Sequence, residues 1–340
     1  MKNSKIEWTD HTFNPWRGCT KVSPGCANCY AEAMSGRNPA VLGSWGPKGS
    51  RVIASESMWR QPVKWNLEAR SERVRRRVFC ASLADVFEGP ETMPAGEYRG
   101  VKAARARLLD LIADTPWLDW LLLTKRPENI MPSLREICGA LDIDGASDYL
   151  AEKWIAGEAP SNVWIGTSME DQAAADRRIP ELLRIPARVR FLSMEPLLGP
   201  VDLAGLAFWT DQDGQIVGVE DRDPESFPHI HWVIVGGESG PRARPMHPDW
   251  ARSIRDQCQQ ASVPFFFKQW GEWAPGSAFR NDAIVMLDDG RTFLQNDIEG
   301  MRAADRNPPF SKLSPKMMHR AGKQAAGREF DGRTWDEVPG

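Results

Sequence analysis

Short apolar runs alternate along this chain with segments of helical periodicity. The runs are rich in β-branched and aromatic residues, and nearly every position in them is hydrophobic. That pattern is typical of strands in a parallel sheet that is covered on at least one face. It predicts strands at 78–82, 120–124, 163–167, 189–193, 232–236 and 264–268.

Between these runs, apolar residues recur three or four positions apart, which predicts helices at 97–113, 126–138, 169–185 and 248–261. Alternation of strands and helices favours an α/β fold with right-handed crossovers. An extended piece within 8–17 brings the count to six strands plus one more. We therefore expect an open (β/α)6-type partial barrel with loop insertions and a polar C-terminal extension.

Composition changes along the chain suggest where this barrel is interrupted. We expect the partial barrel over 1–268, with insertions at 38–66, 139–161 and 207–230. The first insertion is rich in Gly, Pro, Ser and Trp and is expected to be irregular. The third should contain a hairpin turn at Asp213-Gly214. Residues 269–340 are expected to pack on the barrel as an extension that forms no domain of its own.

Charge and hydropathy limit the classes of function. The 340 residues carry a net charge of −3, with a pI near 6.0, so the protein is not broadly basic and would meet nucleic acid only through a local patch. No apolar run has the length of a membrane span, and the first ten residues lack the apolar core of a signal peptide. A cytoplasmic protein is expected, and in that compartment clustered cysteines indicate metal binding or catalysis.

Three of the six cysteines, Cys19, Cys26 and Cys29, lie within eleven residues in the spacing C-x6-C-x2-C. Convergent thiolates suit a soft metal or an iron–sulfur cluster. Four interpretations remain open: a disulfide with one spare thiol, a zinc site closed by His11, unrelated buried thiols, and a 4Fe–4S cluster that keeps one iron free. The other three cysteines are expected to be buried small hydrophobes, namely Cys80, Cys138 and Cys258.

Polar side chains follow nearly every predicted strand. Ligands of parallel α/β sheets bind at the carboxyl ends of strands, so these side chains are candidates for a site. Some have a structural alternative, since Ser82 and Asp85 match the start of a helix, and Gly236-Gly237 suits a tight turn. The candidates are Ser82, Asp85, Ser168, Glu170, Glu195, Gly236, Gly237, Glu238 and Lys268.

A cysteine-rich loop after the first strand of a (β/α)6 partial barrel resembles the radical S-adenosylmethionine superfamily. More narrowly, the chain looks like a phage-associated three-Cys-motif family of uncertain function. The blocks that carry this resemblance are WTDHTFNPWRGCTKVSPGCANCYAE, LLLTKRP, LSMEPLLGP, VIVGGESG and FFFKQWG. Two features differ from the superfamily pattern: its commonest spacing is C-x3-C-x2-C, and its Gly-Gly-Glu motif follows the second strand.

The resemblance implies an enzyme with a 4Fe–4S cluster on Cys19, Cys26 and Cys29, and S-adenosylmethionine bound at the open iron. Reductive cleavage would give a 5′-deoxyadenosyl radical, with electrons from an external donor such as flavodoxin or ferredoxin. By position, Ser82 and Asp85 would contact the methionine amine, Ser168 and Glu170 the ribose, and Gly236 to Glu238 the adenine. The alternative is a non-enzymatic zinc-stabilised binding protein that uses His11 and the three cysteines.

Three features favour modification or repair of a nucleic acid or nucleotide. The first is the phage association of the family that the chain resembles. The second is a set of basic clusters at Arg70–Arg77, Lys125-Arg126 and Arg242–Arg244. The third is a group of tryptophans in segments expected to be irregular, where indoles can stack on bases; they are Trp45, Trp59, Trp65, Trp270 and Trp273.

Overall fold

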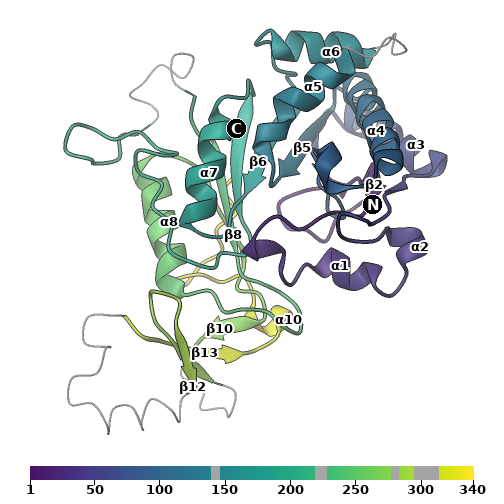
Figure 1. Ribbon diagram of the computed structural model, residues 1–340. Coiled ribbons are helices and arrows are strands. Elements are labelled where there is room, and N and C mark those ends of the chain that lie inside the picture. The colour runs from purple at the N-terminus through teal and green to yellow at the C-terminus, as the bar shows by residue number, and fades with distance from the viewer. Residues whose placement is uncertain (139–145, 219–227, 277–282, 295–313) are drawn as a thin grey trace, which may run out of the picture. The chain divides into compact units, whose positions relative to one another are not determined.

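The structure is a computed structural model that describes residues 1–138, 146–218, 228–276, 283–294 and 314–340 (Figure 1). Seven strands form one open sheet in the order β1-β4-β5-β6-β7-β8-β9. The pairs β1–β4, β4–β5, β5–β6 and β8–β9 are parallel. This confirms the predicted α/β fold of the open (β/α)6 type. The strands are β1 (His11–Thr12), β4 (Arg76–Cys80), β5 (Leu118–Thr124), β6 (Val163–Ser168), β7 (Val189–Met194), β8 (Trp232–Gly236) and β9 (Phe265–Gln269).

The helices expected between these strands are present, with ends that shift by a few residues. Some begin beside a turn residue that the sequence displays, such as Pro248 at the first position of α8. The four are α4 (Ala95–Asp114), α5 (Ile130–Cys138, after the short 3-10 turn Pro127–Asn129), α7 (Gln172–Leu183) and α8 (Pro248–Gln260).

The prediction that residues 38–66 are irregular is wrong for much of that segment. After α2 (Pro39–Leu42) and the short strand β3 (Val52–Ile53), residues 56–72 form the long helix α3 (Glu56–Glu72). Its buried face is made by Trp59, Pro62, Trp65 and other residues about one or two turns apart. A proline in the middle and many charged residues around it conceal that stripe in the sequence.

Two other predicted insertions are described in part. Residues 139–145 and 219–227 lie outside the described residues. Within the insertion at 139–161, α6 (Ala146–Ile155) contacts both α4 and α5. Within the last, the hairpin turn at Asp213-Gly214 is confirmed, because Thr210 and Ile216 form an antiparallel bridge and the Gly214 N–H donates to the Asp211 carbonyl at 3.0 Å.

The C-terminal residues contain a sheet that the sequence did not reveal. Four short antiparallel strands lie in the order β10-β13-β11-β12, with bounds β10 (Trp273–Pro275), β11 (Ile284–Met286), β12 (Thr292–Leu294) and β13 (Lys316–Arg320). The last described stretch then runs along the outer edge of β9. There the Phe267 N–H donates to the Trp335 carbonyl at 2.9 Å, and Phe266 bridges Asp336 in antiparallel fashion.

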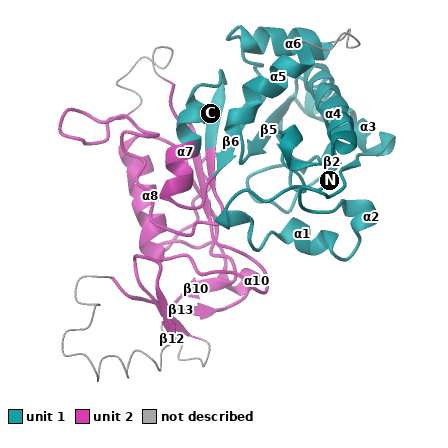
Figure 2. Ribbon diagram, viewed as in Figure 1, with its two compact units in different colours: residues 1–168, 178–191 teal, residues 169–177, 192–340 magenta. Residues whose placement is uncertain are grey.

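The chain divides into two compact units, shown in teal and magenta in Figure 2. Unit 1 comprises residues 1–168 and 178–191, and unit 2 comprises residues 169–177 and 192–340. This division by compactness differs from the domain boundary expected after residue 268. Within the described residues, no helix has both the length and the apolar character that crossing a membrane requires.

Candidate functional site

The cysteine loop belongs to unit 1 and follows the short strand β2 (Trp16–Arg17). It begins at Gly18, whose φ of +106° favours glycine and where a Cβ would lie 2.4 Å from the Ser50 carbonyl oxygen. Cys19 follows directly, Cys26 ends the 3-10 turn Pro24–Cys26, and Cys29 precedes α1 (Tyr30–Ser35). All three cysteines are free and partly exposed, so none of them is in a disulfide.

The thiol of Cys26 lies within electrostatic reach of Cys19 and of Cys29. Burial raises the pKa of Cys19 well above its ordinary value, with further increases from Glu88 and Asp85 that Arg126 opposes. Burial also raises the pKa of Cys29, which backbone N–H groups of Glu32 and Ala31 partly offset. Cys26 raises the pKa of both. Thiols held in the protonated form would have to lose their protons to solvent on binding a metal, so binding would be favoured at higher pH.

Among the described residues, no three His, Cys, Asp or Glu side chains are gathered closely enough to hold a metal ion. The thiols nonetheless fit a soft metal in kind and number. Once deprotonated, the three cysteines provide soft anionic ligands. The cation of Arg126 lies near Cys19 and compensates part of their negative charge.

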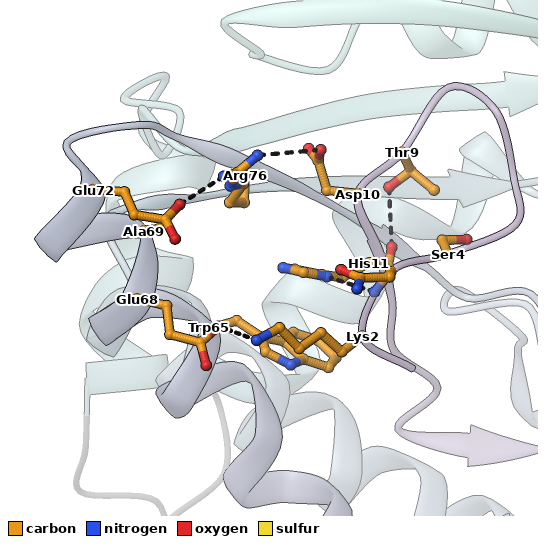
Figure 3. Close-up of a pocket in the computed structure, with 11 residues that line it drawn as sticks. Lys2, Ser4, Thr9, Asp10, His11, Trp65, Glu68, Ala69, Glu72 and Arg76 are labelled. Atoms are coloured by element: carbon orange, nitrogen blue, oxygen red, sulfur yellow. Dashed lines mark hydrogen bonds and ion pairs between the residues drawn. The ribbon is translucent and has the colours of Figure 1, made fainter.

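His11 is engaged at the amino end of β1 (Figure 3). Its Nδ1 accepts a hydrogen bond from the Asn3 backbone N–H at 3.3 Å, and its ring stacks on Trp65 with centroids 4.5 Å apart. It lines a polar cavity of about 340 Å³ together with Lys2, Glu68 and other residues, none of which is a cysteine. This placement gives no support to His11 as a fourth ligand beside the three cysteines.

Asp85 follows β4, and both of its carboxylate oxygens are fully occupied. Oδ1 accepts from the Thr124 hydroxyl at 2.6 Å and from the Phe87 backbone N–H at 3.0 Å. Oδ2 accepts from the Lys125 backbone N–H at 3.0 Å and from the Arg126 guanidinium at 2.8 Å. Burial alone would raise the pKa of Asp85, but Arg126 and these hydrogen bonds outweigh it and lower the pKa.

A second buried ion pair surrounds Thr20, the residue after Cys19. The Arg51 guanidinium makes two hydrogen bonds of 2.8 Å to Glu88, and both side chains are completely buried. Glu88 accepts from the Thr20 backbone N–H at 2.7 Å, and Arg126 donates to the Thr20 carbonyl at 2.6 Å. The Thr20 hydroxyl donates to the Thr92 carbonyl at 2.7 Å and accepts from Arg51 at 3.0 Å.

The other two candidates in unit 1 are serines at strand ends. The Ser82 hydroxyl is hydrogen-bonded by the Asn14 side-chain amide at 3.1 Å, and the Ser82 carbonyl accepts from the Tyr30 hydroxyl at 2.6 Å. Tyr30 follows Cys29, so this bond ties the cysteine loop to the end of β4. Ser168 ends β6 and is buried, and its carbonyl accepts from Arg178 at 2.7 Å.

Unit 2 gathers three of the predicted residues at the ends of its strands. Glu195 follows β7 and forms an ion pair with Lys268 of β9, and the Ser193 hydroxyl donates to Glu195 at 3.3 Å. Between them, Gly236 ends β8. A Cβ at Gly236 would lie 3.3 Å from a Glu195 carboxylate oxygen and 3.5 Å from the Lys268 Cβ. The absence of a side chain there leaves room for the ion pair.

The neighbouring Gly237 and Glu238 are explained by packing within unit 2. A Cβ at Gly237 would lie 1.9 Å from the Trp270 carbonyl oxygen, so the close approach of two backbones requires glycine. The Glu238 carboxylate accepts two hydrogen bonds from the Arg244 guanidinium, at 2.6 and 2.8 Å. It also accepts one from the Arg244 backbone N–H at 2.8 Å. Glu170 is completely buried, and its carbonyl accepts from the Leu198 N–H at 2.7 Å.

Sequence reasoning missed the residues that hold the backbone after Cys19, namely Thr20 itself, Arg51 and Glu88. Glu88 could have been found from the sequence, because it is a second carboxylate three positions after Asp85 in the segment that follows β4. Arg51 could not, since it lies in a stretch of Gly, Pro and Ser where no periodicity marks a buried position.

Comparisons with known proteins give a family and several distant solved structures. No curated protein matches. A spore photoproduct lyase mutant with serine in place of one cysteine has a TM-score of 0.41 at 11% identity, covering 90% of this chain and 74% of that one. A double mutant of that lyase with bound AdoMet and dinucleoside spore photoproduct has a TM-score of 0.40 at 10% identity, covering 89% and 73%. Over residues 3–339 the chain matches a family model, and it therefore belongs to the family described as "Protein of unknown function (DUF5131)".

Proposed function

We propose that this protein is a radical S-adenosylmethionine enzyme whose 4Fe–4S cluster is held by Cys19, Cys26 and Cys29. The observation that carries the proposal is the set of three free, partly exposed cysteines on one loop of a parallel α/β fold. Electron-transfer clusters take four cysteine ligands, so three would leave one iron for a cofactor. When bound, the cluster and S-adenosylmethionine would supply a 5′-deoxyadenosyl radical, and an external donor such as flavodoxin or ferredoxin would supply the electron.

The protein's own residues would position the cofactor and keep water from it. The strand-end residues stay predictions as cofactor contacts: Ser82, Ser168, Glu170, Glu195, Gly236, Gly237, Glu238 and Lys268. Of these, Glu195 and Lys268 offer a carboxylate and an ammonium together, a pair that could exchange its mutual contact for the opposite charges of an amino-acid group.

Anaerobic reconstitution tests the proposal. We expect about four irons per chain, and 5′-deoxyadenosine when the loaded protein is reduced with S-adenosylmethionine present. One tightly bound zinc per chain without cofactor cleavage would overturn the proposal and return the Cys3His alternative.

For the substrate, we propose a nucleic acid or nucleotide. The observation that favours it is in unit 2, where the Arg320 guanidinium lies 5.9 Å from the Trp273 ring centre and donates only to the carbonyls of Gly240 and Pro241 among the described residues. A cation beside a partly exposed indole suits a phosphate next to a base. Several basic residues of the predicted clusters are instead engaged internally, including Arg75, Arg76, Arg126 and Arg244.

Binding to single- and double-stranded DNA over a salt series tests the substrate class. We expect affinity to fall steeply with salt and Arg320→Ala to weaken binding and reduce the salt slope by about one. No binding to DNA or RNA at low salt would favour a peptide or a small metabolite.

A further inference from the structure

The buried charges around Thr20 form one connected arrangement in unit 1. Asp85 binds Arg126, Arg126 binds the Thr20 carbonyl, and the Thr20 N–H binds Glu88, which binds Arg51. The side chains of the Asp85–Arg126 pair are 7% and 4% exposed, and those of the Arg51–Glu88 pair are not exposed at all. We call Asp85, Arg126, Glu88 and Arg51 the charged clamp.

Burying ion pairs is unfavourable unless every polar atom finds a partner. Some of the remaining hydrogen bonds of the clamp go to neighbouring residues such as Gly49 and Phe87, and three go to Thr20. The backbone N–H, the carbonyl and the hydroxyl of Thr20 are all bonded to clamp residues, and Cys19 precedes Thr20 in the chain. The residue immediately after the first cysteine is thereby held at two backbone groups and at its side-chain hydroxyl.

The clamp is itself held by the scaffold. Arg105 of α4 is 2% exposed and donates to the carbonyls of Val86 at 2.9 Å and Glu88 at 2.8 Å. Asp85 is fixed by Thr124 at the end of β5. The segment after β4 is therefore connected to a helix, to the next strand and to the cysteine loop.

We propose that Asp85, Arg126, Glu88 and Arg51 are positioning residues that set Cys19 in place before a metal arrives, and that Asp85 does not contact the cofactor amine. The proposal rests on the proposed function only in what Cys19 binds. Asp85 already accepts four hydrogen bonds, so contact with a cofactor amine would require breaking one of them. A positioning role uses the contacts as they stand.

Two isosteric or charge-conserving variants test this on the full chain. Asp85→Asn removes the charge that holds Arg126, and Arg126→Lys keeps the charge but loses the planar fork that reaches both Asp85 and Thr20. The matched control is Asp119→Asn, which removes the carboxylate of the Arg75–Asp119 pair at the other end of β5.

The first measurement needs no cluster. Hydrogen exchange of the metal-free chain reports on the Thr20 amide, which is bonded to Glu88. We expect at least roughly tenfold faster exchange in a peptide spanning 16–26 for Asp85→Asn and Arg126→Lys, and no change there for Asp119→Asn. Equal protection in the unmodified protein and all three variants would overturn the proposal, and it would do so whether or not the protein binds iron.

The second measurement uses reconstituted protein. We expect both clamp variants to load less iron or to show an altered electron paramagnetic resonance spectrum, while any loaded fraction binds S-adenosylmethionine with a Kd within about threefold of the unmodified protein. Normal iron content with a Kd raised about tenfold or more in Asp85→Asn would assign Asp85 to the cofactor and contradict us. Failure of the unmodified protein to take up iron would refute the proposed function and leave the exchange result to decide the clamp.

Discussion

The six cysteines lie in two kinds of environment. Cys80 and Cys258 are completely buried, whereas the three loop cysteines and Cys138 are partly exposed, so the prediction that Cys138 is buried is wrong. If each loop thiol supplies one of only three ligands, replacing any one of Cys19, Cys26 or Cys29 by Ala should abolish iron binding and cofactor cleavage. Cys80→Ala and Cys258→Ala should keep both and lose about 1 kcal/mol of stability. Iron analysis and denaturant unfolding check this, and loss of iron from folded Cys258→Ala would contradict the ligand assignment.

The buried side chain of His247 predicts how the stability of the fold depends on pH. It is completely buried at the start of α8, and its Nδ1 accepts from the Asp249 N–H at 3.2 Å. Burial lowers the pKa of His247 below 6.5, despite opposing effects of the Ser314 carbonyl and Asp249. The unfolded chain then binds the extra proton more readily, so stability should fall as the pH drops below about 6.5.

His247→Asn should keep an acceptor for the Asp249 N–H and lose this part of the pH dependence. Urea unfolding at several pH values between about 5 and 8 measures it. The difference between the two proteins isolates His247, because His11 titrates in both. Parallel stability curves for the two proteins would show that His247 does not titrate as described.

The sequence predicted the candidate site only where the type of a residue itself indicates a chemical role. Three clustered cysteines are visible in any reading of the chain, and so are the polar residues after each strand. What each polar residue contacts depends on partners far away in sequence. Arg51 lies 37 positions from Glu88, and Arg126 lies 106 positions from Thr20, so no local pattern could reveal either contact.

At the level of elements, alanine substitutions at Gly237 and Gly96 are expected to have opposite effects on stability. A Cβ at Gly237 would lie 1.9 Å from the Trp270 carbonyl oxygen, a backbone atom that cannot turn aside. Gly237→Ala should therefore destabilise unit 2 by about 1–3 kcal/mol or more. Gly96 lies in the first turn of α4 with no atom within 4 Å of its added Cβ, so Gly96→Ala should be neutral or stabilise by up to about 1 kcal/mol. Chemical denaturation compares them, and equal effects would refute the packing argument.

The strands were predicted well because a buried parallel strand is apolar at nearly every position. β8 matches its predicted range of 232–236 residue for residue. α3 was missed because its buried face includes Pro62 and Asn66 beside two tryptophans. The strands β10 to β13 were missed because short antiparallel strands need only a few apolar residues, which polar neighbours obscure.

At the level of the whole molecule, Trp335 holds the last described residues against β9 within unit 2. It is 6% exposed, its ring meets Phe265 edge-on at 5.6 Å, and its indole N–H donates to the Phe330 carbonyl at 3.0 Å. Trp335→Ala should cost about 3–5 kcal/mol. Amides of β8 and β9 should then exchange faster, with β4 and β5 as the reference, and Trp45→Ala serves as a control at a partly exposed indole. Unchanged exchange in β9 would contradict this.

The pairing of the C-terminal residues with β9 also sets an order of events during protein synthesis. Trp335 and Asp336 pair with the outer edge of that strand, yet they leave the ribosome after it. Until they arrive, β9 presents a hydrophobic strand with an open edge, which other nascent chains can pair with. Stalled or shortened translation products should therefore be the form of this protein that aggregates and depends on chaperones.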